Sequence, residues 1–430
     1  AVKAAHEGFE GARAFRRSPL ARFPRLPIVA ACEVSGLGAS GTDRVGDQDV
    51  LVSKPVLAKR KAAGRATERM EELHAGLPVV PFKNLDTMEK KTEGLEWIAV
   101  IHADGNGLGQ LFLDFHNYVG TGQTGEKYKE AYGAFSKALD EVCQEAYRVA
   151  VRETFQAEAA KGSPEEPEQI PIIPIVVAGD DLTVIMDGKK ALRFTEAFMR
   201  AFCAGTSCDG GAGKEETEDR KLLRKLCGKL EGNGQRLGMA AGVCICKPHF
   251  PFSTAYTLAE ELMRSAKQVK QKASLASSAL DFHILYDTTA TSVEDIRGKL
   301  EGGRVVRTGK PFVVETVGTP NDAPWCALHD WAKFTKAVAA FRAKQDGKDK
   351  KPLLPSSQSH AVREMLFSQD PDAQESEWKL LGKRYEGFLK KWKSAVGDDF
   401  LYQKGRTLFL DALEAAEFYE MSSGGAADAN

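Results

Sequence analysis

The sequence predicts an α+β protein whose central part is a ferredoxin-like palm domain of βαββαβ order. Four apolar runs of strand length, at 97–103, 171–178, 182–186 and 237–246, carry this prediction. Helical patterns separate the first run from the second and the third from the fourth. Only a few residues, within the sequence AGDD, separate the second run from the third, which is typical of a hairpin.

A chain of 430 residues is too long for one ordinary core and indicates two or three domains. We expect a small N-terminal α/β region over 1–92, the palm domain over 93–324 and a helical C-terminal domain over 325–430. In the N-terminal region, the run LPIVAACE (26–33) predicts a strand and a pattern rich in Ala, Lys, Arg and Glu over 55–73 predicts a helix.

The elements of the palm domain follow from apolar runs and their period. WIAVIHA (97–103) is a continuous apolar run without polar alternation, so we expect a strand that is buried on both faces of the sheet. Helices are expected over 127–160, 189–201 and 253–272, and a further strand in SALDFHILYD (278–287). Residues 204–235 are Gly-rich and then charged, which indicates a surface insertion.

Composition excludes several classes of protein. The net charge of −1 provides no global basic field for nucleic acid, although a local basic patch stays open. No apolar run reaches the roughly 18–20 residues of a membrane span, and the N-terminus lacks a signal core, so we expect a cytoplasmic protein without membrane contact. Three of the eight cysteines, Cys203, Cys208 and Cys227, could form a zinc site, but their spacing fits no zinc ribbon and plain thiols are favoured.

Three aspartates are expected to meet at one edge of the sheet. Asp104 follows the first strand, and Asp180 and Asp181 lie between the second and third strands. The first and third strands of a ferredoxin-like sheet are antiparallel neighbours, which brings the three carboxylates together. Because such a cluster is costly without a cation, and hard oxygen ligands suit Mg²⁺ or Mn²⁺, the sequence predicts a site for two divalent ions.

Glycines and lysines near these aspartates predict contacts with a triphosphate. The loop after Asp104 consists of Gly105, Asn106, Gly107, Leu108 and Gly109; its backbone N–H groups could approach phosphates, and the Gly105 carbonyl could bind a metal. A tight strand-to-helix turn would be the simpler interpretation if Asp104 stood alone. On the helix over 253–272, Lys267 and Lys270 are expected one turn apart; a solvated basic face is an equally good interpretation.

Two histidines near chemically suggestive residues are better explained as structural. His102 lies two residues before Asp104 and would face the same side of the strand, but such a histidine is more often a satisfied core residue. His329 and Asp330 form an isolated pair without the further ligands of a metal site, which indicates a structural or surface role.

The segments IHADGNGLGQLF, VVAGDDLTVIM and LAEELMRSAKQVKQ, with SALDFHIL, resemble the second palm domain of the polymerase-type large subunit of type III CRISPR effector complexes. That domain carries a GGDD motif and is similar to GGDEF diguanylate cyclases. The resemblance covers about 95–290, and the N-terminal region resembles a reduced first palm domain. By position, Asp104, Asp180 and Asp181 match the metal-binding acids, Ala178 and Gly179 match the glycines of GGDD, and Lys267 lies near the phosphate-binding lysine.

The resemblance implies synthesis of cyclic oligoadenylates from ATP in antiviral defence, with CRISPR-like protein subunits, RNA or a second copy of the chain as partners. The chain departs from the family at Ala178, which replaces a glycine, and at Asn106, where an acid is frequent. It also lacks the HD nuclease segment, so we expect a compact, stand-alone relative. The alternatives are a mononucleotide or dinucleotide cyclase, and a non-catalytic palm scaffold or nucleotide sensor.

Overall fold

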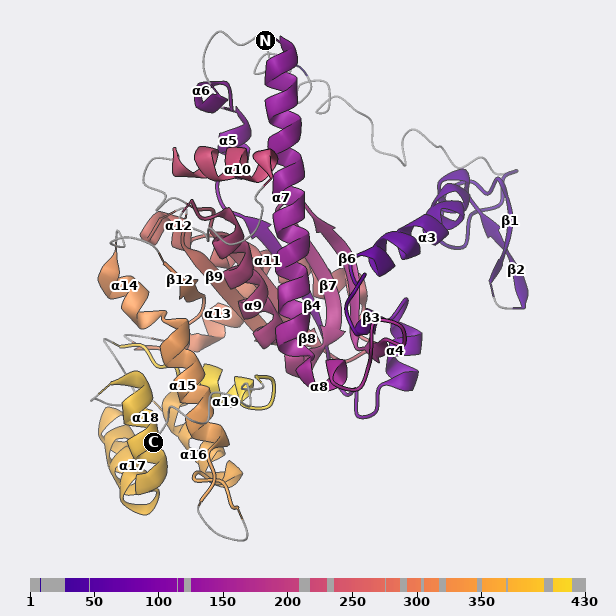
Figure 1. Cartoon of the computed structure of the whole chain (residues 1–430). Helices are drawn as coiled ribbons and strands as arrows, with labels where there is room; N and C mark the ends of the chain where they lie inside the picture. The colour runs from indigo at the N-terminus through magenta and orange to yellow at the C-terminus, as the bar shows by residue number, and fades with distance from the viewer. Residues whose placement is uncertain are drawn as a thin grey trace. The chain divides into compact units, whose positions relative to one another are not determined.

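The computed structural model describes Gly8 and residues 28–45, 47–113, 115–119, 125–208, 217–229, 236–274, 276–286, 292–302, 305–316, 322–345, 350–368, 370–397 and 405–419. The chain divides into two compact units (Figure 1). Unit 1 contains residues 1–76 and 109–114, and unit 2 contains residues 77–108 and 115–430. The domain boundaries expected from the sequence remain predictions. No helix in the described ranges is long and apolar enough to span a bilayer.

Unit 1 contains a hairpin of β1 (Gly41–Val45) and β2 (Gln48–Val52), followed by α3 (Lys54–Glu72). The predicted helix is confirmed, and it begins with Pro55 in its first turn, where the missing N–H of proline costs nothing. The strand predicted over 26–33 is wrong for its described part, 28–33. That segment turns back on itself and forms only one isolated bridge, between Ala31 and Gly38, so its apolar run lacks a partner strand.

Unit 2 is built on a six-stranded sheet of order β12-β9-β8-β4-β7-β6. Its strands are β4 (Ile98–Gly105), β6 (Ile172–Ala178), β7 (Asp181–Asp187), β8 (Met239–Cys246), β9 (Ser278–Ile284) and β12 (Phe312–Glu315). The first four strands in chain order give the ferredoxin-like order β8-β4-β7-β6, as predicted. β4 is antiparallel to both neighbours, and β9 joins parallel to β8.

Helices cover both faces of this sheet, which explains why every residue of β8 is buried. α9 (Gly188–Thr206) packs on one face, where Cys203 Sγ lies 2.9 Å from Ser278 Oγ. α11 (Phe252–Ala266) packs on the other, so closely that a Cβ on Gly242 would lie 2.0 Å from the carbonyl oxygen of Ala259. Gly242 pairs with Asp281, which is three residues from Ser278 on β9 and therefore faces the opposite side.

Two of the helices expected from the sequence, over 127–160 and 253–272, are each interrupted. The segment over 127–160 forms α7 (Gly125–Thr154), the long helix beside the sheet in Figure 1, and a short α8 (Gln156–Ala159). The segment over 253–272 forms α11 and a separate α12 (Val269–Lys272). The prediction that Lys267 and Lys270 share one regular helix is therefore wrong, because Lys267 caps α11 and Lys270 belongs to α12.

Smaller elements complete the region around the sheet. β3 (Val79–Pro81) pairs in parallel with β5 (Glu168–Ile170), and α4 (Leu85–Lys91) follows β3. α10 (Glu218–Gly228) lies within the predicted surface insertion. α13 (Val293–Leu300) and the short pair β10 (Glu301–Gly302) and β11 (Val305–Val306) connect β9 to β12. Two further short helices, α5 (Leu108–Leu113) and α6 (Phe115–Val119), follow β4 in the chain.

The C-terminal part is helical, as predicted. It comprises α14 (Ala323–Leu328), α15 (Trp331–Arg342), α16 (Ser356–Phe367), α17 (Pro371–Arg384), α18 (Glu386–Val396) and α19 (Phe409–Ala415). Aromatic rings hold these helices together: Phe341 packs against Phe388, Trp392 and Phe409 with centroid distances of 5.2, 5.9 and 4.9 Å. Such rings bury large apolar areas, which stabilises a helical domain of this size.

Candidate metal centre

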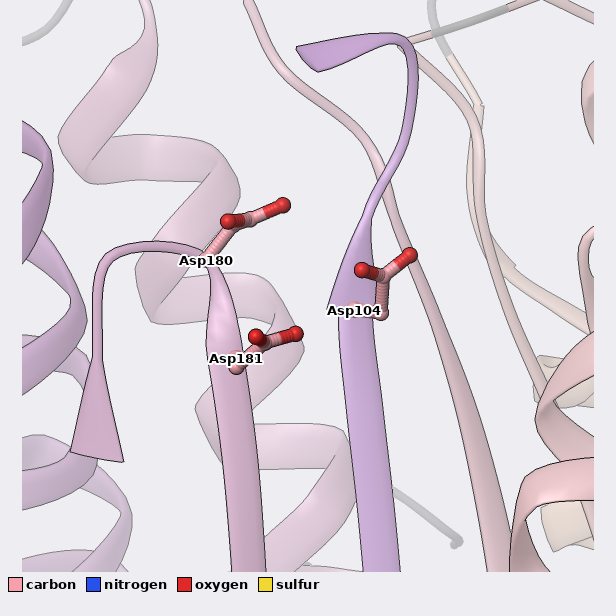
Figure 2. Close-up of side chains that lie close together, drawn as sticks. All are labelled: Asp104, Asp180 and Asp181. Atoms are coloured by element: carbon pink, nitrogen blue, oxygen red, sulfur yellow. The ribbon is translucent and has the colours of Figure 1, made fainter. Parts of the chain in front are cut away.

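Neighbouring strands bring the three predicted carboxylates together. β4 and β7 pair His102 with Thr183 and Ala103 with Leu182, so the next step of the register places Asp104 opposite Asp181. Asp180 lies in the turn directly before β7 (Figure 2). One carboxylate oxygen from each aspartate lies within 4.8 Å of the others. The antiparallel pairing predicted from the strand order therefore places these acids at one edge of the sheet.

The turn that carries Asp180 is fixed by a glycine and by a helix. Gly179 has φ +63°, a conformation that glycine adopts without strain. Its N–H donates to Asp140 Oδ1 on α7 at 3.0 Å, and Gln144 Nε2 donates to the other oxygen of Asp140 at 2.8 Å. Asp140 is not among the site residues predicted from the sequence, because nothing in its local pattern distinguishes it from a solvated helix residue. Gly179, a predicted nucleotide ligand, thus has its N–H engaged within the protein.

Close contact with Asp180 explains the glycine at position 105. A Cβ on Gly105 would lie 2.8 Å from Asp180 Cβ and 2.7 Å from Leu108 Cδ1, well inside van der Waals contact. Gly107 has φ +81° and turns the chain into Leu108, which is buried. Both glycines are therefore required by the backbone around the carboxylates. Gly109 belongs to unit 1, and its contact with a nucleotide stays a prediction.

Asn106 anchors this loop, and its contact with a nucleotide stays a prediction. Its side chain is buried, and Nδ2 donates to the carbonyl oxygen of Ser277 at 2.9 Å. Its backbone N–H donates to the carbonyl of Gly238 at 2.9 Å. The amide thus ties the end of β4 to the segments that enter β8 and β9, a role that an aspartate would fill less well because it has no N–H to donate.

The electrostatics of the cluster favour binding of a cation. Burial raises the pKa of Asp180 to about 6, and the neighbouring charge of Asp181 adds to the effect. Burial also raises the pKa of Asp181, against the opposing influence of His102. A nearby cation favours the ionised form of carboxyl groups whose pKa is raised in this way. The chemistry of the donor set, oxygen atoms only, fits Mg²⁺ or Mn²⁺.

Lys267 provides one positive charge beside the cluster. Lys267 is the C-cap residue of α11, and its ammonium forms an ion pair with Asp104 Oδ2. Burial lowers the pKa of Lys267, and the nearby charge of Lys270 lowers it further. Lys270 is therefore close enough to act on the same region, although it lies on α12. A single ammonium cannot balance three carboxylates, so negative charge remains for another cation.

His102 faces the same side of β4 as Asp104, as predicted, and is satisfied there. Its Nδ1 lies 3.1 Å from Thr183 Oγ1, and its ring lies 5.4 Å from that of Tyr256 on α11. Burial lowers the pKa of His102, partly offset by Asp181, so the ring is neutral near neutral pH. This environment agrees with the structural role expected for it. Ala178 pairs with Asp181 across the hairpin and is exposed on the same face.

Within the described ranges, these aspartates form the only group of three or more His, Cys, Asp or Glu side chains arranged to hold a metal. The thiols of Cys203 and Cys227 are buried, and burial raises their pKa to about 11 and about 12. The preference for plain thiols over a zinc site at these cysteines stays a prediction. His329 is also structural: Nδ1 lies 2.9 Å from the Pro311 carbonyl oxygen, and Asp330 accepts the N–H of Ala332 to cap α15.

Comparison with known proteins gives the same assignment for the central region. Residues 97–276 match the family described as Cas10/Cmr2, second palm domain. No curated protein sequence matches the chain. Among solved structures, the chain is similar to a crystal structure of Csm1 in T. onnurineus, with 13% identity over 77% of this chain and 40% of that chain and a TM-score of 0.42.

Two further crystal structures are similar at the same identity of 13%. A Csm1–Csm4 cassette in complex with cA4 aligns over 74% of this chain and 36% of that chain, with a TM-score of 0.39. A Csm1–Csm4 subcomplex in the type III-A CRISPR-Csm interference complex aligns over the same shares, with a TM-score of 0.35. The chain thus spans about two fifths of the length of these proteins. The sheet order and the three clustered aspartates agree with the family match, in which the segment 97–276 is similar to the second palm domain of Cas10/Cmr2 proteins.

Proposed function

We propose that this chain is a two-metal nucleotidyltransferase that joins nucleoside triphosphates, ATP first among them, into cyclic oligonucleotides or cyclic dinucleotides. One observation carries the proposal: Asp104, Asp180 and Asp181 present carboxylate oxygens within 4.8 Å of one another on an open edge of a palm sheet. Mg²⁺ or Mn²⁺, two ions when the site is loaded, would activate the attacking 3′-hydroxyl and neutralise the leaving pyrophosphate.

The residues around the site have distinct parts in this proposal. Asp104, Asp180 and Asp181 would hold the metals, with the Gly105 carbonyl as a further oxygen ligand. Lys267 would move from Asp104 to the triphosphate once the metals neutralise the carboxylates, and Lys270 would support it by charge. Gly107 and Leu108 shape the loop beside the phosphates. Catalysis would then rest on positioning and charge neutralisation, since no side chain is placed as a general base.

The cellular setting follows from the family alone. A cytoplasmic, CRISPR-associated role in antiviral defence, with protein subunits, RNA or a second copy of the chain as partners, is part of the proposal. So are the preference for ATP, the 3′–5′ linkage and the cyclic nature of the product.

The experiment is incubation of the protein with each of the four triphosphates and Mg²⁺ or Mn²⁺, followed by mass spectrometry of the products. The proposal expects cyclic products that require metal and disappear with EDTA and with Asp181→Asn. The matched control is Asp86→Asn, which removes an exposed carboxylate on α4 and should leave product yield unchanged. Absence of any product with every triphosphate, alone and with type III complex subunits and target RNA, would contradict an enzymatic role.

A second candidate function is a non-catalytic palm scaffold or nucleotide sensor. The ion pair between Lys267 and Asp104 favours it, because it compensates part of the charge without any metal. The remaining two carboxylates oppose it, since a scaffold would be more stable with neutral residues there. Binding of metal and ATP in calorimetry, without product, would support this candidate.

A further inference from the structure

Unit 2 contains a cavity that lies away from the three clustered aspartates. It has a volume of about 380 Å³, within the range of small-molecule sites. Its wall comes from the end of β9, one face of α13 and one face of α16. The lining residues are His283, Ile284, Tyr286, Ile296, Lys299, Leu300, Lys310, Arg363, Phe367 and Glu414.

The cavity lies toward the opposite end of the sheet from the carboxylates. Ile284 on β9 is level with Ile245 on β8 and, through it, with Ala99 on β4. Asp104 is five residues further along β4, about 16 Å at the usual rise of a strand. A ligand in this cavity would therefore not compete directly for the predicted metals.

Two cations on the wall, Lys299 and Arg363, form no ion pair or hydrogen bond with any of the residues described in the structure. Arg363 lies near enough to Glu414 for its charge to oppose the rise in pKa that burial causes in that carboxyl group. The carboxylate in the lining, Glu414, is balanced by Lys310, whose Nζ lies 3.5 Å from Glu414 Oε2 and 3.4 Å from Asp411 Oδ1. The uncompensated charge on the wall is therefore positive, which favours an anionic ligand.

Two aromatic rings of the wall are exposed and yet held in place. Tyr286 is 60% exposed and Phe367 is 42% exposed, although rings of this size are usually buried. The Tyr286 ring packs edge-on against Trp97 at 5.4 Å. The guanidinium of Arg307 lies 4.8 Å from the Phe367 ring and donates through Nε to the Leu366 carbonyl oxygen at 2.5 Å. Rings fixed in this way can stack on a ligand with little further loss of entropy.

We propose that this cavity binds a nucleoside monophosphate unit, with the base stacked on Tyr286 or Phe367 and the phosphate bound by Lys299 and Arg363. Exposed aromatic rings beside unpaired cations are the combination that binds nucleotides without sequence readout. A free nucleotide and the terminal nucleotide of an RNA strand share this chemistry. The site goes beyond the metal-dependent reaction proposed above, because it requires neither the metals nor the aspartates.

The phenol of Tyr286 stays neutral in this arrangement. Burial raises its pKa to about 12, and the charges of Glu414 and Glu417 contribute in the same direction. Tyr286 therefore adds no negative charge that would repel a phosphate at neutral pH.

The test is calorimetric titration of the full chain in EDTA, where the clustered carboxylates repel phosphates. The probes are AMP and a 5′-phosphorylated tetraadenylate. We expect one site, retained in Asp180→Asn/Asp181→Asn. Its affinity should fall roughly tenfold or more in Lys299→Ala/Arg363→Ala and in Tyr286→Leu. The control Lys391→Ala/Lys393→Ala removes two exposed charges from α18, neither of which lines the cavity. Circular dichroism establishes that each variant is folded.

The two probes distinguish the sources. Equal affinity for both indicates a free nucleotide, and tighter binding of the tetraadenylate indicates a strand end; either supports the site. The proposal is overturned if neither probe binds, or if binding is unchanged in both cavity variants. It is equally overturned if the variants alter only self-association in sedimentation, which would assign this face to protein contact.

Discussion

Two clusters of charged side chains in unit 2 differ in how their charge is balanced. At the sheet edge, Asp104, Asp180 and Asp181 face one another, and the one ion pair that they form with described residues joins Asp104 to Lys267. Elsewhere in unit 2, the carboxylates of Asp281 and Asp411 are almost completely buried and each has its own partners. Arg297 pairs with Asp281, and Lys310 lies 3.4 Å from Asp411.

The Asp411 carboxylate of the buried cluster is compensated by several partners within the protein. Asp411 accepts the hydroxyl of Thr308 at 3.0 Å and the N–H of Gly309 at 2.6 Å in addition to the Lys310 ammonium. A buried charge with this many partners maintains the fold and has no need of a ligand. The edge cluster is incomplete, because burial and like charge raise the pKa of Asp180. The difference between the two clusters shows that a cation-binding site is indicated by uncompensated negative charge and not by the number of acidic residues.

The largest expected effect is loss of activity on neutralising the edge cluster. Asp180→Asn and Asp181→Asn should each reduce product formation by about a hundredfold or more, because each removes a metal ligand. The measurement is product yield by mass spectrometry at fixed metal concentration. Full turnover by both variants would show that these aspartates are not needed for the reaction. The edge cluster would then not differ in function from the buried cluster.

The same substitution should affect stability in the opposite direction. The pKa of Asp180 is higher in the folded chain, about 6, than the value of about 3.9 usual for an unfolded one. The folded state therefore binds the proton more tightly, and stability falls as pH rises through this window. Asp180→Asn should abolish that fall and raise the metal-free melting temperature at neutral pH. Added Mg²⁺ or Mn²⁺ should stabilise the wild type more than the variant.

The second effect is destabilisation on breaking the buried cluster. Asp281→Ala leaves Arg297 without its partner and should reduce the free energy of unfolding by about 3–5 kcal/mol. The double variant Asp281→Leu/Arg297→Met should recover most of this loss, because it replaces the pair with apolar groups. Urea denaturation of both variants is the measurement. If the double variant is as unstable as the single one, the pair has a role beyond mutual compensation.

A smaller effect is expected from Lys267→Ala, because Lys267 compensates only part of the charge of the edge cluster. Loss of a charged contact to phosphate is worth on the order of 1.5–3 kcal/mol, or about tenfold or more in triphosphate affinity. The control is Arg264→Ala, an exposed cation near the end of the same helix that pairs with Glu260. Equal affinities for ATP and metal in calorimetry for the two variants would return Lys267 to a solvated basic face.

The smallest effect concerns Ala178, the departure from the GGDD motif. Ala178 pairs with Asp181 and shares its face, so its methyl group borders the site. Ala178→Gly should change the distribution of products while metal affinity stays the same, and should lower stability by roughly 0.5–1 kcal/mol. Ion-pair chromatography across the four triphosphates measures the products. Identical profiles at matched turnover would show that the methyl group does not restrict the site.

The central sheet and the identity of the three carboxylates were predictable from the sequence alone. Continuous apolar runs require strands buried on both faces, and the short AGDD turn permits only a hairpin between two of them. Once that order is known, antiparallel pairing of the first and third strands follows from the fold. The position of Asp104 beside Asp181 is therefore a consequence of local patterns and of one topology.

Tertiary structure decided what the local patterns could not. Asp140 holds Gly179 from a helix 39 residues away, Asn106 bonds to Ser277 across 171 residues, and α11 ends where Lys267 meets Asp104. The described part of the predicted strand, 28–33, forms only the single bridge between Ala31 and Gly38, because so short a pairing does not stabilise a regular strand. Periodicity reports which side of an element is buried, but it does not report which distant group a polar side chain will bond. Those bonds depend on the positions of the ends of the packed helices and strands, and these positions are determined only by the tertiary structure.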